Sequence, residues 1–386
     1  MNQRERWVGV MHFQPVDHVT DREFGYWAET LQAWHTQGLP EYVNDDVRAD
    51  AYFGLESELM PPVNVLTQPW FEHEVIEDHD DYQILMSWDG AQQMVKKDSV
   101  SIPKYIRYAI ETREDWERIK AERLNPSTPE RVPSADEWTR WKAMAEASGQ
   151  IVGIDVGSLF GFTRNWLGFE NVSYAIMDDP EWIEEITEHL TNLTLSVIGP
   201  LIKDFKFDFG KMWEDICFNH GPIIQPRHFE EWIVPRLKRI TGLLAENGCD
   251  VVYVDCDGNI NELVPLWLDA GVNCMFPLEA RGGTNAVDLR QKYGRRILLM
   301  GGVDKTRLIA GKEEIRKEIA RIKPLVEDGG YIPHVDHRCP PDVTLENYLY
   351  YLKLKRETFG IPEPEPWEDR RDEYEWAREN TKTCCR

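Results

Sequence analysis

A strand-like segment that ends in two carboxylates is the first place where this sequence could do chemistry. The apolar run at 251–254 stops abruptly at Asp255-Cys256-Asp257-Gly258. Residues two apart on a strand project to the same side, so Asp255 and Asp257 are predicted to form a paired acidic face while Cys256 points the other way. Such a pair could bind a metal ion or move protons.

A second segment repeats this pattern further along the chain. A short apolar run after Gly329-Gly330 ends at His334, Asp336 and His337. Imidazole and carboxylate side chains are typical metal ligands and typical acid/base groups. Because both clusters follow strand-like runs, we expect them to meet at one edge of a sheet.

The fold class follows from an alternation of strand-like and helix-like runs after residue 150. Strands are predicted at 151–156, 207–213, 250–254, 272–277, 297–300 and 330–333. Helices are predicted at 180–203, 226–246, 259–269, 285–292, 312–327 and 345–359. Six such units, with room for two more upstream, predict an α/β protein with a (β/α)8 TIM barrel, whose active site lies at the carboxyl ends of the strands.

Residues upstream of 150 predict a helical and hairpin elaboration. Helical spacing marks Arg4–Met11 and Phe24–Gln37, and Asp89-Gly90 between two strand-like runs indicates a hairpin. We expect one barrel over residues 1–360, with the elaboration and first strands in 1–150 and the six units in 151–360. Residues 361–386 are expected to form an acidic, Pro-rich tail with a helix near Arg370–Arg378.

Composition excludes several classes of function. The 386 residues carry a formal charge of -24, which disfavours nucleic acid and anionic membranes as partners. The apolar runs are too short for a membrane span, and the first residues lack a signal-peptide pattern, so we expect a cytoplasmic protein. Seven cysteines without regular spacing predict neither a disulfide framework nor a CxxC zinc motif.

Several short motifs occur in a defined order along the chain. They are Arg4-Glu5-Arg6, Pro15-Val16-Asp17, Gly157-Ser158-Leu159, Asp178-Asp179-Pro180, Glu214-Asp215, Asp257-Gly258-Asn259-Ile260, Gly301-Gly302-Val303-Asp304, Gly329-Gly330-Tyr331, His337 and Pro341-Asp342-Val343. This order resembles the uroporphyrinogen decarboxylase superfamily, which includes the haem-pathway decarboxylase and corrinoid-linked methyltransferases that methylate coenzyme M.

The resemblance implies a metal site in the methyltransferase branch. Those methyltransferases bind zinc through His-x-Cys and a later cysteine, and the corresponding positions here are Asp255, Asp257 and His337. The decarboxylase also has histidine at the last of these positions. Its substrate loop carries two arginines, whereas the matching segment here has only Arg22. The chain is therefore closer to the methyltransferase branch.

Replacing thiolates by carboxylate and imidazole makes a harder Lewis acid, which suits oxygen-bound substrates. The prediction is a zinc ion held by Asp257 and His337 with Asp255 or Glu214. This zinc would polarise a methoxy or alcohol donor whose methyl group passes to a separate corrinoid protein, as in O-demethylation. The catalytic residues are predicted as Asp257, His337 and Glu214. The substrate-binding residues are predicted as Arg22, Arg164, His220 and His334.

Other interpretations stay open at this point. A metal-free decarboxylase or lyase could hold a small acid with Arg22 and Arg164 and move protons with an Asp–His pair. A third possibility is a binding barrel without catalysis. A homodimer is possible, because members of the superfamily often dimerise.

Individual residues also have structural alternatives. Arg164 could pair with Glu170, His220 could be structural, Asp257 and Asp304 could cap helices, and His334 could orient a ligand.

Overall fold

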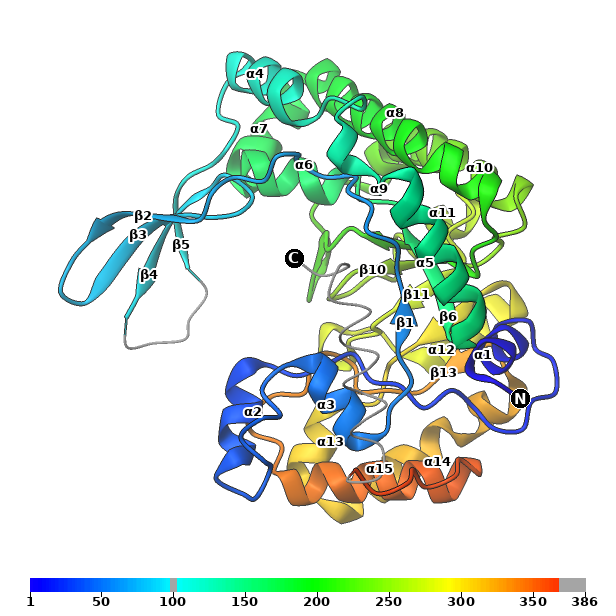
Figure 1. Ribbon diagram of the computed structural model, residues 1–386. Helices are drawn as coiled ribbons and strands as arrows, with labels where there is room; N and C mark the ends of the chain where they lie inside the picture. The colour runs from blue at the N-terminus through cyan, green and yellow to red at the C-terminus, as the bar shows by residue number, and fades with distance from the viewer. Residues whose placement is uncertain (98–102, 368–386) are drawn as a thin grey trace.

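A parallel sheet of seven strands forms the centre of the computed structural model, which describes residues 1–97 and 103–367 (Figure 1). The spatial order is β1-β6-β7-β10-β11-β12-β13, and every neighbouring pair is parallel. The strands are β1 (Glu58–Leu59), β6 (Ile151–Asp155), β7 (Phe209–Trp213), β10 (Val252–Asp255), β11 (Cys274–Phe276), β12 (Leu298–Met300) and β13 (Tyr331–Ile332). Parallel neighbours direct all the carboxyl ends to one edge of the sheet.

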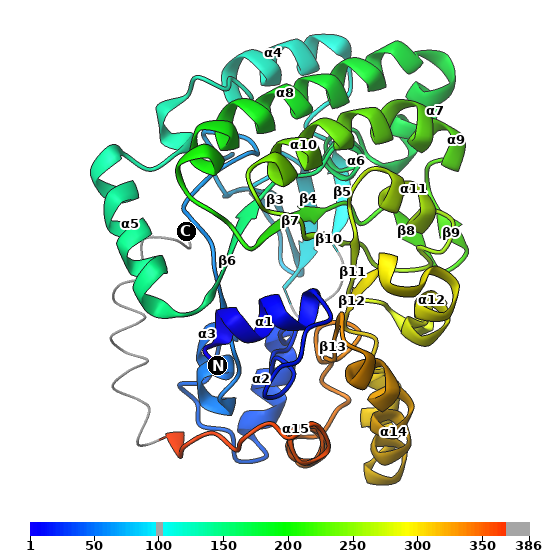
Figure 2. The ribbon, with the colours of Figure 1, turned by 90° about the vertical axis from the view of Figure 1, so that its right-hand side faces the viewer.

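Helices connect the strands and cover the outer face of the curled sheet (Figures 1 and 2). They are α6 (Phe160–Leu167), α7 (Phe169–Asp178), α8 (Pro180–Asp204), α9 (Pro226–His228), a π turn (Phe229–Ile233), α10 (Val234–Glu246), α11 (Val264–Asp269), α12 (Ala286–Tyr293), α13 (Lys305–Ala310), α14 (Lys312–Asp328) and α15 (Leu345–Phe359). Between β7 and α9 lies the small hairpin of β8 (Cys217–Phe218) and β9 (Gly221–Pro222). Short 3-10 turns occupy Pro129–Arg131, Ala280–Gly282 and Gly294–Arg296.

Two apolar clusters hold these layers together. One lies between the sheet and its helices, and the other fills the inside of the curl with side chains such as Phe209, Tyr253 and Phe276. Helix α1 (Gln3–Met11) closes the amino end of the inner cluster, where the Trp7 and Phe209 ring centroids are 5.3 Å apart. Its N-terminus is set by a capping box between Asn2 and Glu5. Apolar packing therefore closes the amino end of the curl.

The curled sheet has seven strands in the described residues, whereas eight were expected. The gap between β13 and β1 is spanned by residues 19–26, where Asp21 O accepts from Glu56 N (2.7 Å) and Gly25 O accepts from Cys339 N (2.9 Å). Buried Lys355 of α15 is 2.9 Å from Asp21 and 2.7 Å from Glu23. Backbone bonds and an isolated parallel bridge between Tyr26 and Cys339 join this segment to its neighbours, but no continuous ladder forms there in the described residues.

A separate antiparallel sheet precedes β6 and projects away from the curl (Figure 1). Its order is β2-β3-β4-β5, made of β2 (Glu74–Asp78), β3 (Tyr82–Met86), β4 (Gln92–Lys96) and β5 (Lys104–Arg107). The hairpin expected around Asp89-Gly90 is present as β3 and β4. The other helices of this region are α2 (Ala28–His35), α3 (Asp46–Phe53), α4 (Arg113–Arg123) and α5 (Ala135–Ser148).

Most of the predicted elements are confirmed. The six strands predicted after residue 150 agree with β6, β7 and β10–β13 to within two residues at each end. Helices α6 and α7 were not predicted, α13 was expected only as a short helix capped by Asp304, and the helix expected from 259 begins at Val264. The helix expected near 370–378 lies outside the described residues. No helix in the described residues is long and apolar enough to span a membrane.

Candidate active site

The candidate site is centred on Asp257 and His337, which come from different strand ends. Asp257 follows β10 and His337 follows β13, and Asp257 Oδ2 lies 3.0 Å from His337 Nε2. Burial lowers the pKa of His337, but the hydrogen bond and the charge of Asp257 outweigh it, so the net shift is upward. The carboxylate therefore orients the ring and favours the imidazolium form.

Gly258 explains how the chain turns at this point. It has φ 79°, and a Cβ there would lie 2.7 Å from the carbonyl oxygen of Cys217. Only glycine combines this left-handed conformation with such a close backbone approach. The neighbouring Cys256 is buried on the other side of the strand, as predicted, where its Sγ accepts from Ile216 N at 3.3 Å.

Two further carboxylates, Asp255 and Asp215, are close enough to Asp257 to respond to its charge. Burial first, and then the negative charge of Asp257, raise the pKa of Asp255 to about 7. The pKa of Asp215 is also raised, by burial first and by Asp257 second. The charge of Asp257 therefore acts on both Asp255 and Asp215. Like charges this close disfavour full ionisation, so the cluster can retain protons near neutral pH.

Glu214, which was predicted as a catalytic residue and zinc ligand, contacts the start of α6 instead. Its carboxylate is fully buried and accepts from three backbone N–H groups at the start of α6, those of Leu159 (2.8 Å), Phe160 (3.1 Å) and Gly161 (2.8 Å). Asp215, at φ 40°, is in the left-handed region, and this turn directs it, in place of Glu214, toward Asp257. Burial raises the pKa of Glu214 to about 7 against the opposing hydrogen bonds. Its contacts are those of a helix anchor.

Arg164 and His220 also differ from the expected arrangement. Arg164 Nη2 donates to the carbonyl oxygen of Asp215 at 2.8 Å and approaches Oδ2 at 3.3 Å. Its partner is therefore Asp215 and not Glu170. The guanidinium lies 5.7 Å from the centre of the Trp213 ring. His220 is exposed in the turn between β8 and β9.

A buried ionic network inside the curl contains Arg22, which was predicted to bind substrate, and three residues that the sequence did not indicate, Glu58, Lys211 and Tyr253. Arg22 Nη2 donates to Glu58 Oε2 at 2.9 Å, Lys211 Nζ is 3.5 Å from Glu58 Oε1, and Tyr253 Oη donates to the same oxygen at 3.4 Å. Burial raises the pKa of Glu58, but Arg22 and Lys211 lower it to a net value of about 2. The available signal was Lys211, a charged residue inside an otherwise apolar strand.

His334 occupies the same interior region. Burial first, and then the charge of Arg22, lower the pKa of His334 to about 3, so the ring is neutral at physiological pH. Its Nδ1 lies 2.8 Å from the carbonyl oxygen of Val335, which can only accept, so Nδ1 carries the proton. Nε2 then presents a lone pair, and it has no partner in the described part of the chain. Arg22 Nη1 is likewise buried without a partner there.

Aromatic rings form the wall beside the Asp257–His337 pair. Trp27 stacks on the His337 ring with centroids 5.5 Å apart and planes 24° apart, and 45% of Trp27 is exposed. Phe24 meets His337 edge-on at 5.5 Å and Phe276 at 4.6 Å. A planar ligand could therefore pack close to the imidazole.

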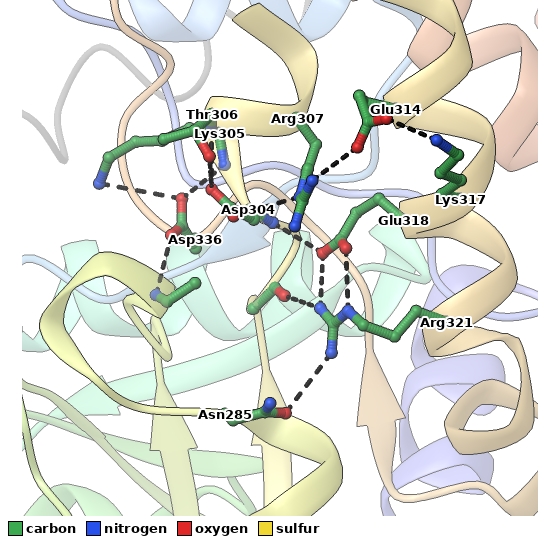
Figure 3. Close-up of polar contacts among 12 residues, drawn as sticks. Asn285, Asp304, Lys305, Thr306, Arg307, Glu314, Lys317, Glu318, Arg321 and Asp336 are labelled. Carbon is green, nitrogen blue, oxygen red and sulfur yellow. Dashed lines mark hydrogen bonds and ion pairs between the residues drawn. The ribbon is translucent and has the colours of Figure 1, made fainter. Parts of the chain in front are cut away.

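The loops after β11, β12 and β13 are held by a polar network (Figure 3). Asp336 is fully buried and accepts from Lys305 N (3.1 Å) and Ala280 N (2.9 Å). Asp304 caps α13 by accepting from Thr306 N at 2.8 Å, which confirms its predicted structural role. The network fixes the loop that carries His337.

The expected zinc ligands are only partly assembled. Asp257 and His337 lie together, and Asp257 Oδ1 is buried without a hydrogen-bond partner in the described residues, which would suit a cation. Both carboxylate oxygens of Glu214 already accept hydrogen bonds from the start of α6. Within residues 1–97 and 103–367, no three His, Cys, Asp or Glu side chains are grouped so as to hold a metal ion. Because catalytic zinc normally has three protein ligands, this arrangement is not a complete zinc site.

Comparison with known proteins now defines the family. The sequence model of the family described as Uroporphyrinogen decarboxylase (URO-D) matches residues 98–357, which is more than half of the chain. The protein belongs to the uroporphyrinogen decarboxylase family, as the order of the motifs indicated. No curated protein matches the sequence.

One similar solved structure is that of a methyltransferase from Methanosarcina mazei. Its TM-score is 0.59 at 14% sequence identity, over 92% of this chain and 98% of that chain. At this identity the likeness shows a shared fold.

Proposed function

We propose that this protein is a methyltransferase that takes a methyl group from an oxygen-bound donor and passes it to a corrinoid carried by a partner protein. The observation that carries the proposal is the Asp257–His337 pair at the open end of the curl, beside exposed Trp27. Family membership and the fold shared with the methanogen methyltransferase support the reaction type. An ether or alcohol needs a proton on its leaving oxygen, and this pair can supply one.

The proposed step uses only side chains of this chain and the two substrates. His337 Nε2 is hydrogen-bonded to Asp257, so Nδ1 of the imidazolium is available to donate a proton. The corrinoid Co(I) supplies the electron pair that forms the new bond to the methyl group. The oxygen keeps the electrons of the broken carbon–oxygen bond and takes the proton from His337. The products are an alcohol or phenol and a methylated corrinoid, and the ring is reprotonated from solvent.

Aromatic methoxy compounds are the donor class that we favour. Trp27 and Phe24 offer a stacking wall for a ring, and the acidic cluster of Asp215 and Asp255 disfavours donors with several carboxylates. Asp255 has a pKa of about 7, so it can be protonated near neutral pH. A neutral carboxyl is easier to place beside an uncharged methoxy group than a carboxylate is.

Zinc binding stays a proposal that the mechanism above does not need. If zinc binds, Asp257 and His337 would be two of its ligands, and the ion would supply Lewis-acid activation of oxygen. Elemental analysis of the purified, tag-free protein tests this directly. About one zinc per chain, lost in both Asp257→Ala and His337→Ala, would support it. Wild-type zinc content in these variants would contradict the ligand assignment.

The function is tested by mixing purified protein, reduced corrinoid and a panel of methoxylated aromatic compounds. We expect loss of the Co(I) absorbance and release of the demethylated product. His337→Gln should reduce the rate by about 10²–10⁴-fold, the usual range for a general acid. Demethylation that proceeds at the same rate without cobalt would exclude the proposal.

One observation favours a second candidate, a decarboxylase or lyase of a small acid. Arg22 Nη1 is buried and unpartnered in the described residues, and Lys211 is close by, so a carboxylate could bind inside the curl. The same protein would then release CO2 or an unsaturated acid without corrinoid. Incubation with candidate acids and measurement of these products separates the two functions.

A further inference from the structure

Within the described residues, the antiparallel sheet β2–β5 is a single layer whose apolar side chains are partly exposed. Figure 1 shows it projecting from the curl, and its apolar side chains belong to neither apolar cluster. Val75, Ile76, Tyr105 and Ile106 are each at least 39% exposed. A sheet normally buries one face against another layer, so a partner for this sheet is expected.

The charges on one face of this sheet are arranged in rows. Paired residues on neighbouring strands share a face, and two successive rows on this face begin with an acid on β2 and end with a base on β5. The first row is Glu77–Ile84–Met94–Lys104. The second row is Glu74–Met86–Gln92–Arg107. The middle of each row is uncharged.

The opposite face of the sheet has a different character. Its central row is Val75–Leu85–Gln93–Tyr105, which carries no charge. Tyr105 stacks on Tyr108 at 5.3 Å, in the segment that leads back to the curl. The charged face therefore lies on the other side from this stacked pair.

We propose that the charged face of β2–β5 binds the same face of a second copy of this chain. A two-fold axis parallel to the strands reverses the order of the strands in the partner. Glu77 of one protomer then faces Lys104 of the other, Glu74 faces Arg107, and the uncharged centres of the rows meet. A face that runs from acid to base is complementary to itself under this rotation, whereas pairing of equal edges would bring like charges together.

The groups needed for this contact are accessible. Glu74 and Lys104 form no ion pair within the described residues. Glu77 has an exposed contact with His79 at 2.8 Å, and Arg107 one with Glu111 at 3.4 Å. Exposed ion pairs of this kind contribute little, so they exchange readily for contacts across an interface.

The dimer is expected to be weak. Four strands about 4.8 Å apart and five residues long at about 3.4 Å each give a face of roughly 300 Å² per protomer. This is well below the roughly 800 Å² per partner of a standard stable interface, so a dissociation constant in the micromolar range or above is expected. Because the contact is partly ionic, salt should weaken it.

Sedimentation velocity of the full chain at increasing concentration and low salt tests the proposal. We expect reversible dimerisation that Glu77→Lys and Lys104→Glu each weaken by about tenfold or more, because each change acts twice across the two-fold axis. The double variant E77K/K104E should restore the wild-type dissociation constant to within about threefold. Glu122→Lys on α4 makes the same charge change away from the sheet and should have no effect.

Three outcomes would overturn the proposal. The chain could remain monomeric at all concentrations. The double variant could dimerise no better than the single variants, which would show that complementary charge is not the cause. Finally, the wild type could remain monomeric while E77K impairs binding of a corrinoid protein, which would assign the face to that partner.

Discussion

Glu214 is the residue whose structural role can be told apart most clearly from a catalytic role. The carboxylate is fully buried, with Oε1 accepting from Leu159 N and Oε2 accepting from Phe160 N and Gly161 N. Replacing Glu214 with alanine would leave three N–H groups at the start of α6 without an acceptor in a site closed to water. We therefore predict that Glu214→Ala destabilises the fold before it affects any chemistry.

The magnitude follows from these three hydrogen bonds. Each buried donor left unpaired costs about 1–3 kcal/mol, and neighbouring donors on one helix end do not add fully, so a loss of about 3–5 kcal/mol is expected. An unfolding entropy of about 2.1 cal/mol/K per residue gives about 0.8 kcal/mol/K for 386 residues. The predicted decrease in Tm is therefore about 4–6 °C. Glu214→Gln keeps one acceptor oxygen and should lose about 1–3 kcal/mol.

Thermal unfolding followed by circular dichroism at neutral pH is the assay. Asp257→Ala is the matched control, because that side chain is 32% exposed and its loss should cost no more than about 1 kcal/mol, or roughly 1 °C. A Tm of Glu214→Ala within 1 °C of the wild type would refute the helix-anchor role. If the same variant then lost zinc or activity, the original assignment of Glu214 as a ligand would be restored.

Three further predictions concern protonation and capping. In Asp257→Asn the pKa of His337 should fall, as measured by NMR titration of the ring protons. In the wild type, the stability contributed by this pair is fully present below the unfolded histidine pKa of about 6.5. It is lost as the pH rises through the higher pKa of the folded state. Asp255 has a folded pKa of about 7 against about 3.9 unfolded, so the folded state binds more protons between these values and Tm should fall as pH rises from 4 to 7. Asp255→Asn should make this decrease smaller, and an unchanged slope would contradict the assignment. Asp304→Ala removes the N-cap of α13 and should lower the free energy of unfolding by about 1 kcal/mol, whereas Asp304→Ser should retain most of it.

Local sequence pattern was sufficient to predict the barrel strands in the second half of the chain. Strands β6, β7 and β10–β13 were predictable because each is a short apolar run between amphipathic helices, and that pattern depends only on neighbouring residues. The Asp257–His337 contact was also anticipated, because parallel strands bring their carboxyl ends to one edge. Asp304 was predicted as a cap from its position before a helical run.

Side-chain direction and long-range pairing were decided only by the tertiary structure. The choice between Glu214 and Asp215 depends on a positive φ at Asp215, which no local pattern reveals, and it moved Glu214 from the site to α6. Glu58 and Lys211 come from β1 and β7, about 150 residues apart in the chain, and only the curl of the sheet brings them together. The eighth barrel position, filled by residues 19–26, depends on Lys355 of α15 at the other end of the chain. Sequence periodicity thus determined the elements and the edge where polar groups meet, whereas burial and distant charges determined which of those groups face one another.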